Sequence, residues 1–240
     1  MATVGCGRPP LSVSVVAVNP EMVVTDDVPG AFAQEVITAF VDRPGEEFDI
    51  ALSGGEAAQA CYERLALEAA QAVDWLVVNF FWGHECCVPP DHPDSNELLG
   101  RRALLERVGA ANAVYPMRCE EGLDAYQLRL GEIGQLDVVH LVLGPDGRTA
   151  GLFPSSEALD ADPGQLVTFS EDPTGICEHR SMTLTYAGIA RARLAIFTVD
   201  GEDQRPAMEA LVAGEDSPAA RVRAGRVLWL VGKDAAPRAV

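Results

Sequence analysis

Lysine is almost absent from this chain, which has 240 residues and 18 basic side chains, and Lys233 is its one lysine. Any site that requires a lysine therefore has only Lys233 available. Positive charge is scarce overall, since the formal net charge is −18 and the isoelectric point is about 4.5. This balance disfavours nucleic acids and anionic membranes as partners, because both are polyanions. It does not exclude an anionic small molecule, which a local group of arginines can bind.

Other familiar signals are also missing. No apolar run approaches the roughly 18 residues that a membrane span requires, and the N-terminus shows no pattern of a secretory signal. The cysteines form neither a CxxC pair nor a standard zinc spacing. These absences predict a cytoplasmic protein with reduced thiols and no bound metal. The six cysteines are Cys6, Cys61, Cys86, Cys87, Cys119 and Cys177.

Apolar strand patterns alternate with helical patterns along the whole chain, without an internal repeat or a low-complexity linker. This alternation predicts one α/β domain over residues 1–240, with a doubly wound, mainly parallel sheet and helices on both faces. Strands are expected at 13–18, 48–52, 75–82, 112–115, 138–143, 166–169, 194–199 and 227–231. Helices are expected at about 56–70, 120–133, 183–191 and 205–212. A further helix is expected to begin after Asp27, and another to run from an N-cap at Asn96 to residue 108. Residues 83–95 are expected to form a loop.

Two of the expected strands run into glycine turns. Residues 139–154 read VHLVLGPDGRTAGLFP, in which an apolar run reaches a Gly-Pro-Asp-Gly turn at 144–147. Ser53, Gly54 and Gly55 follow another strand and precede a helix, whose N-terminal N–H groups could bind an anion. An open α/β sheet binds its ligand at such strand ends. A tight turn without a ligand is the alternative for 53–55, and the carboxylate of Glu56 counts against an anion there.

The segment 83–95, GHECCVPPDHPDS, concentrates reactive side chains in His84, Glu85, Cys86 and Cys87. A metal site or a cysteine nucleophile is conceivable, but consecutive residues seldom converge on one ion, and no oxyanion site is marked. Arg180 precedes an expected helix. Its planar guanidinium suits a phosphate, although a surface arginine is the simpler reading.

These pieces, in this order, resemble the 6-phosphogluconolactonase family over nearly the whole chain. The most specific match is Val88-Pro89-Pro90-Asp91-His92-Pro93-Asp94-Ser95-Asn96, nine consecutive residues. The GPDG turn followed by Leu152-Phe153-Pro154, Arg180 before Thr183-Leu184-Thr185, and Trp229 complete the pattern. The resemblance implies a Rossmann-like fold. It further implies hydrolysis of 6-phospho-D-glucono-1,5-lactone to 6-phosphogluconate, in the oxidative pentose phosphate pathway, without a metal or organic cofactor. A sugar phosphate would be the ligand of a monomer or a small homo-oligomer.

The chain departs from the family pattern at five positions. Arg148 stands where the family has its catalytic histidine, and Gln204 replaces a lysine. His84-Glu85-Cys86 replaces Asp-Glu-Arg, and Glu56 replaces the serine that ends SGGS. Arg148 cannot be a base, because a guanidinium keeps its proton. If positions 84 and 148 face each other, His84 could be the base and Arg148 the cation.

Three hypotheses follow: an active lactonase, a catalytically silent sugar-phosphate binder, and a related enzyme such as a glucosamine-6-phosphate deaminase. The PPDHPDSN loop and the GPDG turn favour the first over the third. The candidate catalytic residues are His84, Arg148 and Asp146, and the candidate substrate-binding residues are Ser53, Gly54, Gly55, Asn96, Gly147, Arg180 and Gln204.

Overall fold

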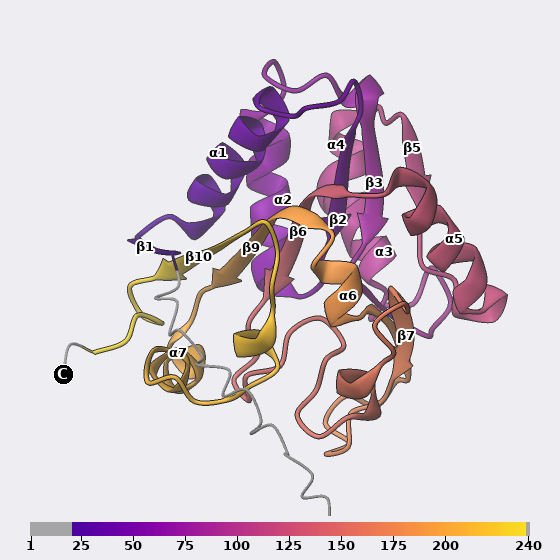
Figure 1. Cartoon of the computed structure of the whole chain (residues 1–240). Coiled ribbons are helices and arrows are strands. Elements are labelled where there is room, and N and C mark those ends of the chain that lie inside the picture. Colours follow the sequence, from indigo (N-terminus) through magenta and orange to yellow (C-terminus); the bar gives the residue numbers. More distant parts are fainter. Residues whose placement is uncertain (1–20, 239–240) are drawn as a thin grey trace, which may run out of the picture.

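A computed structural model describes residues 21–238. Its main feature is a seven-stranded sheet in the order β1-β10-β9-β6-β2-β3-β5, in which every pair of neighbours is parallel (Figure 1). The predicted fold class is confirmed. The strand expected at 13–18 lies outside the described residues. The strands are β1 Glu21–Thr25, β2 Phe48–Leu52, β3 Val78–Trp82, β5 Ala113–Tyr115, β6 Leu136–Val142, β9 Ala192–Val199 and β10 Arg226–Gly232.

Helices cover both faces of the sheet because the chain changes direction along it. The connections β1-α1-β2 and β2-α2-β3 advance toward the β5 edge, whereas β5-α5-β6 and β9-α7-β10 return toward the β1 edge. Right-handed crossovers then place α1 and α2 on one face and α5 and α7 on the opposite face, and α3 packs beside α2. The helices are α1 Val28–Val41, α2 Glu56–Glu68, α3 Asn96–Gly100, α4 Glu106–Val108, α5 Leu123–Ile133, α6 Tyr186–Ile189 and α7 Arg205–Val212, with a π-helical turn, Arg101–Leu105, joining α3 to α4.

The core lies between the sheet and these helices. All five residues of β3 are buried, as expected of a central parallel strand covered on both faces. His140 is a polar exception in the middle of β6. It is fully buried between the Tyr62 hydroxyl and the Thr198 hydroxyl, each 2.9 Å from one ring nitrogen. Its position within this network indicates a structural role.

A second sheet lies beyond the carboxyl ends of the parallel strands. It has three antiparallel strands in the order β4-β8-β7, with β4 at His84–Cys86, β7 at Val167–Ser170 and β8 at Ser181–Leu184. Two predictions are wrong here. The expected loop at 83–95 begins with β4, and the expected helix at 183–191 is divided between β8 and the short α6. In both cases antiparallel pairing between distant segments decides the structure.

Smaller differences concern boundaries and a cap. Residues 75–77 form a 3₁₀ turn before β3. The N-cap of α3 is Ser95, whose hydroxyl accepts from the Leu98 N–H at 3.1 Å, and Asn96 is the first helical residue. Asn96 is thereby free to make the contacts described below.

Cys87 and Cys119 form a disulfide, so the expectation that the thiols are reduced is wrong for this pair. The pairing of β5 with β3 carries the segment after β5 toward the loop after β4, and this arrangement brings the two cysteines together. Cys61, Cys86 and Cys177 are free. Among the helices of residues 21–238, none has the length and apolar character to cross a membrane.

Candidate active site

The candidate residues converge on the edge of the sheet where its parallel strands end. Ser53–Gly55 follow β2, and His84 lies two residues beyond β3. The turn at 144–148 follows β6, and the turn that carries Gln204 follows β9. β2 and β6 are neighbours from which the chain proceeds in opposite directions along the sheet. Such a switch point is where open α/β sheets bind ligands.

Asn96 joins two of these strand ends. Its side-chain amide donates to the His84 carbonyl oxygen at 2.8 Å and lies 3.3 Å from His84 Nδ1. The same carboxamide packs directly onto Gly54, where an added Cβ would meet Asn96 Oδ1 at 1.7 Å. Position 54 therefore accepts only glycine while Asn96 stays in place, which explains the first glycine of the Ser-Gly-Gly turn.

His84 presents one ring nitrogen without a partner. Its Nε2 is inaccessible to solvent and has no hydrogen-bond partner among the described residues, although the side chain as a whole is partly exposed. Burial, and secondarily the nearby positive charge of Arg148, lower the pKa of His84 to about 4. The imidazole is therefore neutral near pH 7. A buried polar atom without a partner indicates a place for a ligand group or a water molecule.

The contacts of Asn96 also select the tautomer of His84. The amide nitrogen of Asn96 must face the His84 carbonyl oxygen, because the amide oxygen in its place would repel that carbonyl. The second N–H of the amide then points to Nδ1, which accepts it. A neutral imidazole that accepts at Nδ1 carries its proton on Nε2. In this arrangement His84 offers a hydrogen-bond donor toward the site.

The turn after β6 orients Arg148. Asp146 accepts from the Arg148 backbone N–H at 3.1 Å and forms an ion pair with its guanidinium at 3.4 Å. The Arg148 side chain folds over Gly144, where an added Cβ would lie 2.4 Å from its Cγ. Gly147 has a φ of +79° and packs against Ser217. The turn thus holds a cation close enough to His84 to lower its pKa.

Two residues that the sequence analysis named without a role in the site also shape it. Thr183 of β8 pairs with His84, and its hydroxyl accepts from the Gly151 N–H at 3.0 Å. Glu85 is a buried carboxylate that accepts from the backbone N–H groups of Cys86, Asn96 and Glu97. Burial raises its pKa to about 7 despite those hydrogen bonds. The signals for Glu85 in the sequence were its position beside His84 and its match to the glutamate of the family's Asp-Glu-Arg triplet.

Other candidates lie apart from this contact network. The Arg180 guanidinium stacks over Phe169, 3.8 Å from the ring centroid, and is 3.9 Å from Glu171. Its side chain is half exposed, which leaves it available to a ligand. Gln204 accepts from the Asp200 N–H at 2.8 Å. The Ser53 N–H donates to the Tyr62 hydroxyl at 2.5 Å, which fixes the end of β2. The roles proposed for these residues in substrate binding stay predictions.

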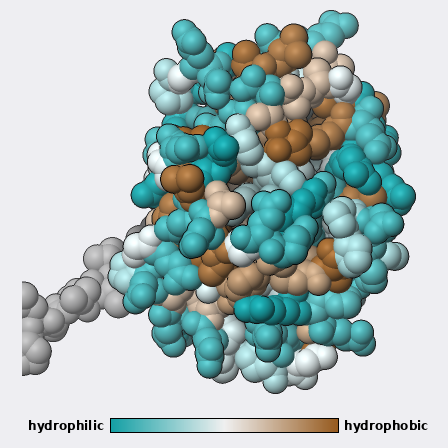
Figure 2. All heavy atoms as spheres, turned by 90° about the vertical axis from the view of Figure 1, so that its right-hand side faces the viewer, coloured by the Kyte–Doolittle hydropathy of each residue, from teal (hydrophilic) through white to brown (hydrophobic). Residues whose placement is uncertain are grey.

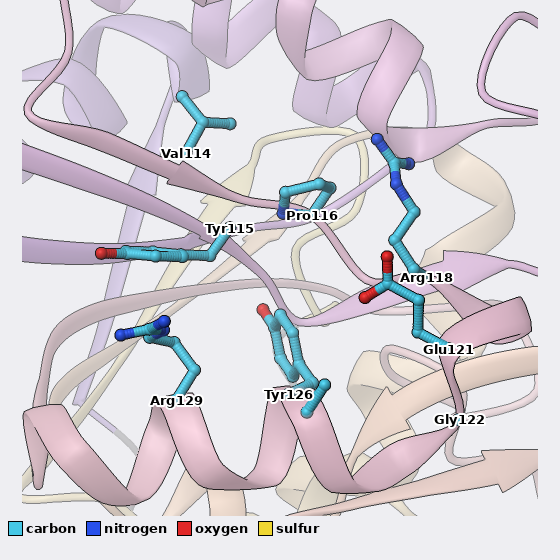
Figure 3. A pocket seen from close by; sticks show the side chains of 9 residues that line it. Val114, Tyr115, Pro116, Arg118, Glu121, Gly122, Tyr126 and Arg129 are labelled. Atoms are coloured by element: carbon cyan, nitrogen blue, oxygen red, sulfur yellow. The ribbon is translucent and has the colours of Figure 1, made fainter.

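A cavity of about 250 Å³ lies elsewhere, between β5 and α5 (Figure 3). None of the candidate residues lines it. Its cations already have partners, since Arg118 pairs with Glu97 and Arg129 pairs with Glu132 and stacks on Tyr115. Figure 2 views the molecule from this side and shows hydrophobic groups gathered in the upper part of a largely hydrophilic surface. The strand ends are the better candidate, because several independent residues converge there.

Comparison with known proteins shows the family to which the chain is related. The family model for glucosamine-6-phosphate isomerases/6-phosphogluconolactonase matches residues 24–229. The chain belongs to this family. The resemblance inferred from the motifs is thereby confirmed.

Relatives within the family are similar over most of their length. A 6-phosphogluconolactonase of Nostoc sp. is 38% identical over 203 residues, which cover 77% of this chain and 81% of that protein. One from Mycobacterium tuberculosis is 33% identical over 79% of this chain and 84% of that protein. The structure of the 6-phosphogluconolactonase of Thermotoga maritima has a TM-score of 0.79 at 25% identity and covers 89% of this chain and all of that one. A monomeric glucosamine-6-phosphate deaminase, with a TM-score of 0.75 at 13% identity over 90% of this chain and 98% of that chain, shares the fold.

Proposed function

We propose that this protein hydrolyses 6-phospho-D-glucono-1,5-lactone to 6-phosphogluconate. The observation that carries the proposal is the neutral His84, whose buried Nε2 has no partner among the described residues and lies near Arg148 at the strand ends. Membership in the family and the names of its relatives support this substrate. The proposed reaction consumes only the lactone and water, and the mechanism below uses no organic cofactor or metal.

In the proposed mechanism, His84 and Arg148 polarise the lactone. The Nε2–H group of His84 donates to the carbonyl oxygen, and the Arg148 guanidinium balances the negative charge that develops there when water attacks. Asp146 orients Arg148 and offers a carboxylate that can accept the proton of the attacking water. The tetrahedral intermediate then collapses, the ring C–O bond breaks, and the departing ring oxygen takes the proton that Asp146 accepted from the water.

We further propose that the phosphate of the substrate binds on the exposed side of the site. Arg180 is half exposed and could bind an anion, and the backbone N–H groups of Gly54 and Gly55 precede the N-terminus of α2. Gln204 at the end of β9 and Asn96 at the start of α3 would contact the sugar. Arg180→Ala should raise KM for the phosphorylated lactone and leave kcat nearly unchanged, because it removes binding that is equal in ground and transition states.

The experiment that tests the function measures lactone hydrolysis above the spontaneous rate. Fresh 6-phosphogluconolactone is made in situ, and 6-phosphogluconate is followed with a coupled dehydrogenase. Unphosphorylated gluconolactone serves as the matched substrate control. A rate above the blank that prefers the phosphorylated lactone supports the proposal. A rate equal to the blank, with 6-phosphogluconate still raising the melting temperature, would instead identify a silent sugar-phosphate binder.

A further inference from the structure

Three potential metal ligands lie together on the rim of the second sheet, and the proposed hydrolysis uses none of them. They are His92 and Asp94, from the loop between β4 and α3, and His179, which precedes β8. One donor atom from each lies within 4.8 Å of the other two. The reactive run from His84 to Cys87, considered from the sequence as a metal site, contributes none of these atoms.

The fold brings these ligands together from distant parts of the sequence. β4 and β8 pair antiparallel through Cys86 and Ser181, and the pairing continues as the Cys87 N–H donates to the Arg180 carbonyl at 2.8 Å. The chain beyond β4 therefore lies beside the chain that enters β8. A second constraint acts within the first loop, where the Ser95 N–H donates to the His92 carbonyl at 3.0 Å. Both halves of the cluster are thus held by backbone hydrogen bonds.

The spacing of the donor atoms suits a tetrahedral ion. His179 Nε2 lies 3.0 Å from Asp94 Oδ2, and His92 Nδ1 lies 3.7 Å from the same oxygen. A tetrahedral zinc ion with bonds of 2.0–2.1 Å separates its ligand atoms by about 3.3 Å, so small rotations of the side chains would suffice. The side chains are between 32% and 57% exposed, which leaves an open path for an ion and for a water ligand.

The tautomer of His92 also suits a metal ligand. The Asp94 N–H points at His92 Nδ1 from 3.2 Å, so Nδ1 presents its lone pair and the proton is on Nε2. A metal at Nδ1 would use that lone pair in place of the long hydrogen bond. Two imidazoles and one carboxylate are a ligand set that zinc accepts, and the strongly negative protein attracts cations.

We propose that His92, Asp94 and His179 form a binding site for Zn²⁺ or a similar divalent transition metal, with water as the fourth ligand. The ion links the loop that leads into Asn96 and α3 to the segment that carries Arg180. Its bonds replace the contact of 3.0 Å between Asp94 and His179. The site is distinct from the proposed catalytic residues, and its existence does not depend on the proposed function.

The test is a titration of the full-length, untagged protein with Co²⁺ after treatment with a chelator, followed by competition with Zn²⁺. Tetrahedral Co²⁺ has strong visible absorption bands, which report both occupancy and geometry. We expect one ion per chain and a higher melting temperature with Zn²⁺. His179→Ala and His92→Ala should each weaken binding about 100-fold or more, since the loss of even outer-shell partners costs 10- to 100-fold.

Two controls make the outcome specific. Asp91→Ala removes a carboxylate from the same loop outside the cluster, and it should leave the affinity unchanged. A Cys86→Ser, Cys177→Ser double variant removes the free thiols of the neighbouring segments, and it should also bind normally. The proposal is overturned if the wild type fails to bind, or if both histidine variants, confirmed as folded by circular dichroism, bind as the wild type does. Loss of binding in the cysteine variant alone would also overturn it, because a thiolate site would then account for the metal.

Discussion

Replacing Asn96 with aspartate should convert His84 from a hydrogen-bond donor to a base. The substitution places a carboxylate about where the amide nitrogen now lies, 3.3 Å from His84 Nδ1. A unit charge at about 4 Å is worth about 4 kcal/mol at an effective dielectric constant of 20, which equals about 3 pH units. The pKa of His84, now about 4, should therefore rise to near 7. The proton should move to Nδ1, which leaves a lone pair on Nε2.

The assay is nitrogen–proton NMR of the imidazoles as a function of pH, which is tractable because the chain has four histidines. Asn96→Ala is the matched control, since it removes both hydrogen bonds of the amide without adding charge. The aspartate variant should also lose about 1–3 kcal/mol of stability, because the buried His84 carbonyl loses its donor. An unchanged His84 pKa in Asn96→Asp, or the same rise in Asn96→Ala, would refute the reasoning about the tautomer.

Three further predictions concern stability. Burial lowers the pKa values of His84 to about 4 and of His140 to about 3, whereas the unfolded chain binds these protons near pH 6.5, so the two histidines should reduce stability as pH drops below 6.5. The raised pKa of Glu85, about 7, acts in the opposite direction. At pH 4.5 the two histidines together should lower the free energy of unfolding, measured with urea, by up to about 5 kcal/mol relative to neutral pH. His84→Gln should remove about half of this pH dependence. An unchanged pH dependence in that variant would contradict the buried, neutral state of His84. Gly54→Ala should lower the free energy of unfolding by about 1–3 kcal/mol, because the added methyl group clashes with Asn96, and it should lower kcat. Unchanged stability in this variant would show that the Asn96 side chain moves freely. Cys87→Ser should cost about 2–4 kcal/mol by opening the disulfide, and a melting temperature equal to that of the wild type would mean that the bond adds no stability.

The sequence predicted the main sheet well because its strands carry strong local signals. Residues 48–52 form β2 as expected, and the apolar run that ends at Trp82 contains β3. The polar segment His84–Cys86 has no such signal. It is a strand because its backbone pairs with β8, which lies far along the chain. The helix expected from Thr183 is wrong for the same reason.

The convergence of the candidate residues was predictable, but the contacts among them were not. Parallel strands that end in glycine turns indicated the edge of the sheet at which residues after β2, β3 and β6 converge. The packing of Asn96 onto Gly54 depends on where α3 begins relative to β2. The Cys87–Cys119 disulfide depends on the position of β5 beside β3. No spacing in one sequence reveals such contacts.

The most direct test of the account compares lactone hydrolysis by the wild type, His84→Gln and His84→Ala, each measured above the spontaneous rate. Loss of one oxyanion donor costs about 10²- to 10³-fold in kcat. We therefore expect that decrease in His84→Ala, and a smaller decrease in His84→Gln, whose amide keeps an N–H donor. Equal and complete loss in both variants would identify His84 as a base instead of a donor. Turnover in His84→Ala equal to that of the wild type would contradict the central claim that His84 acts on the lactone.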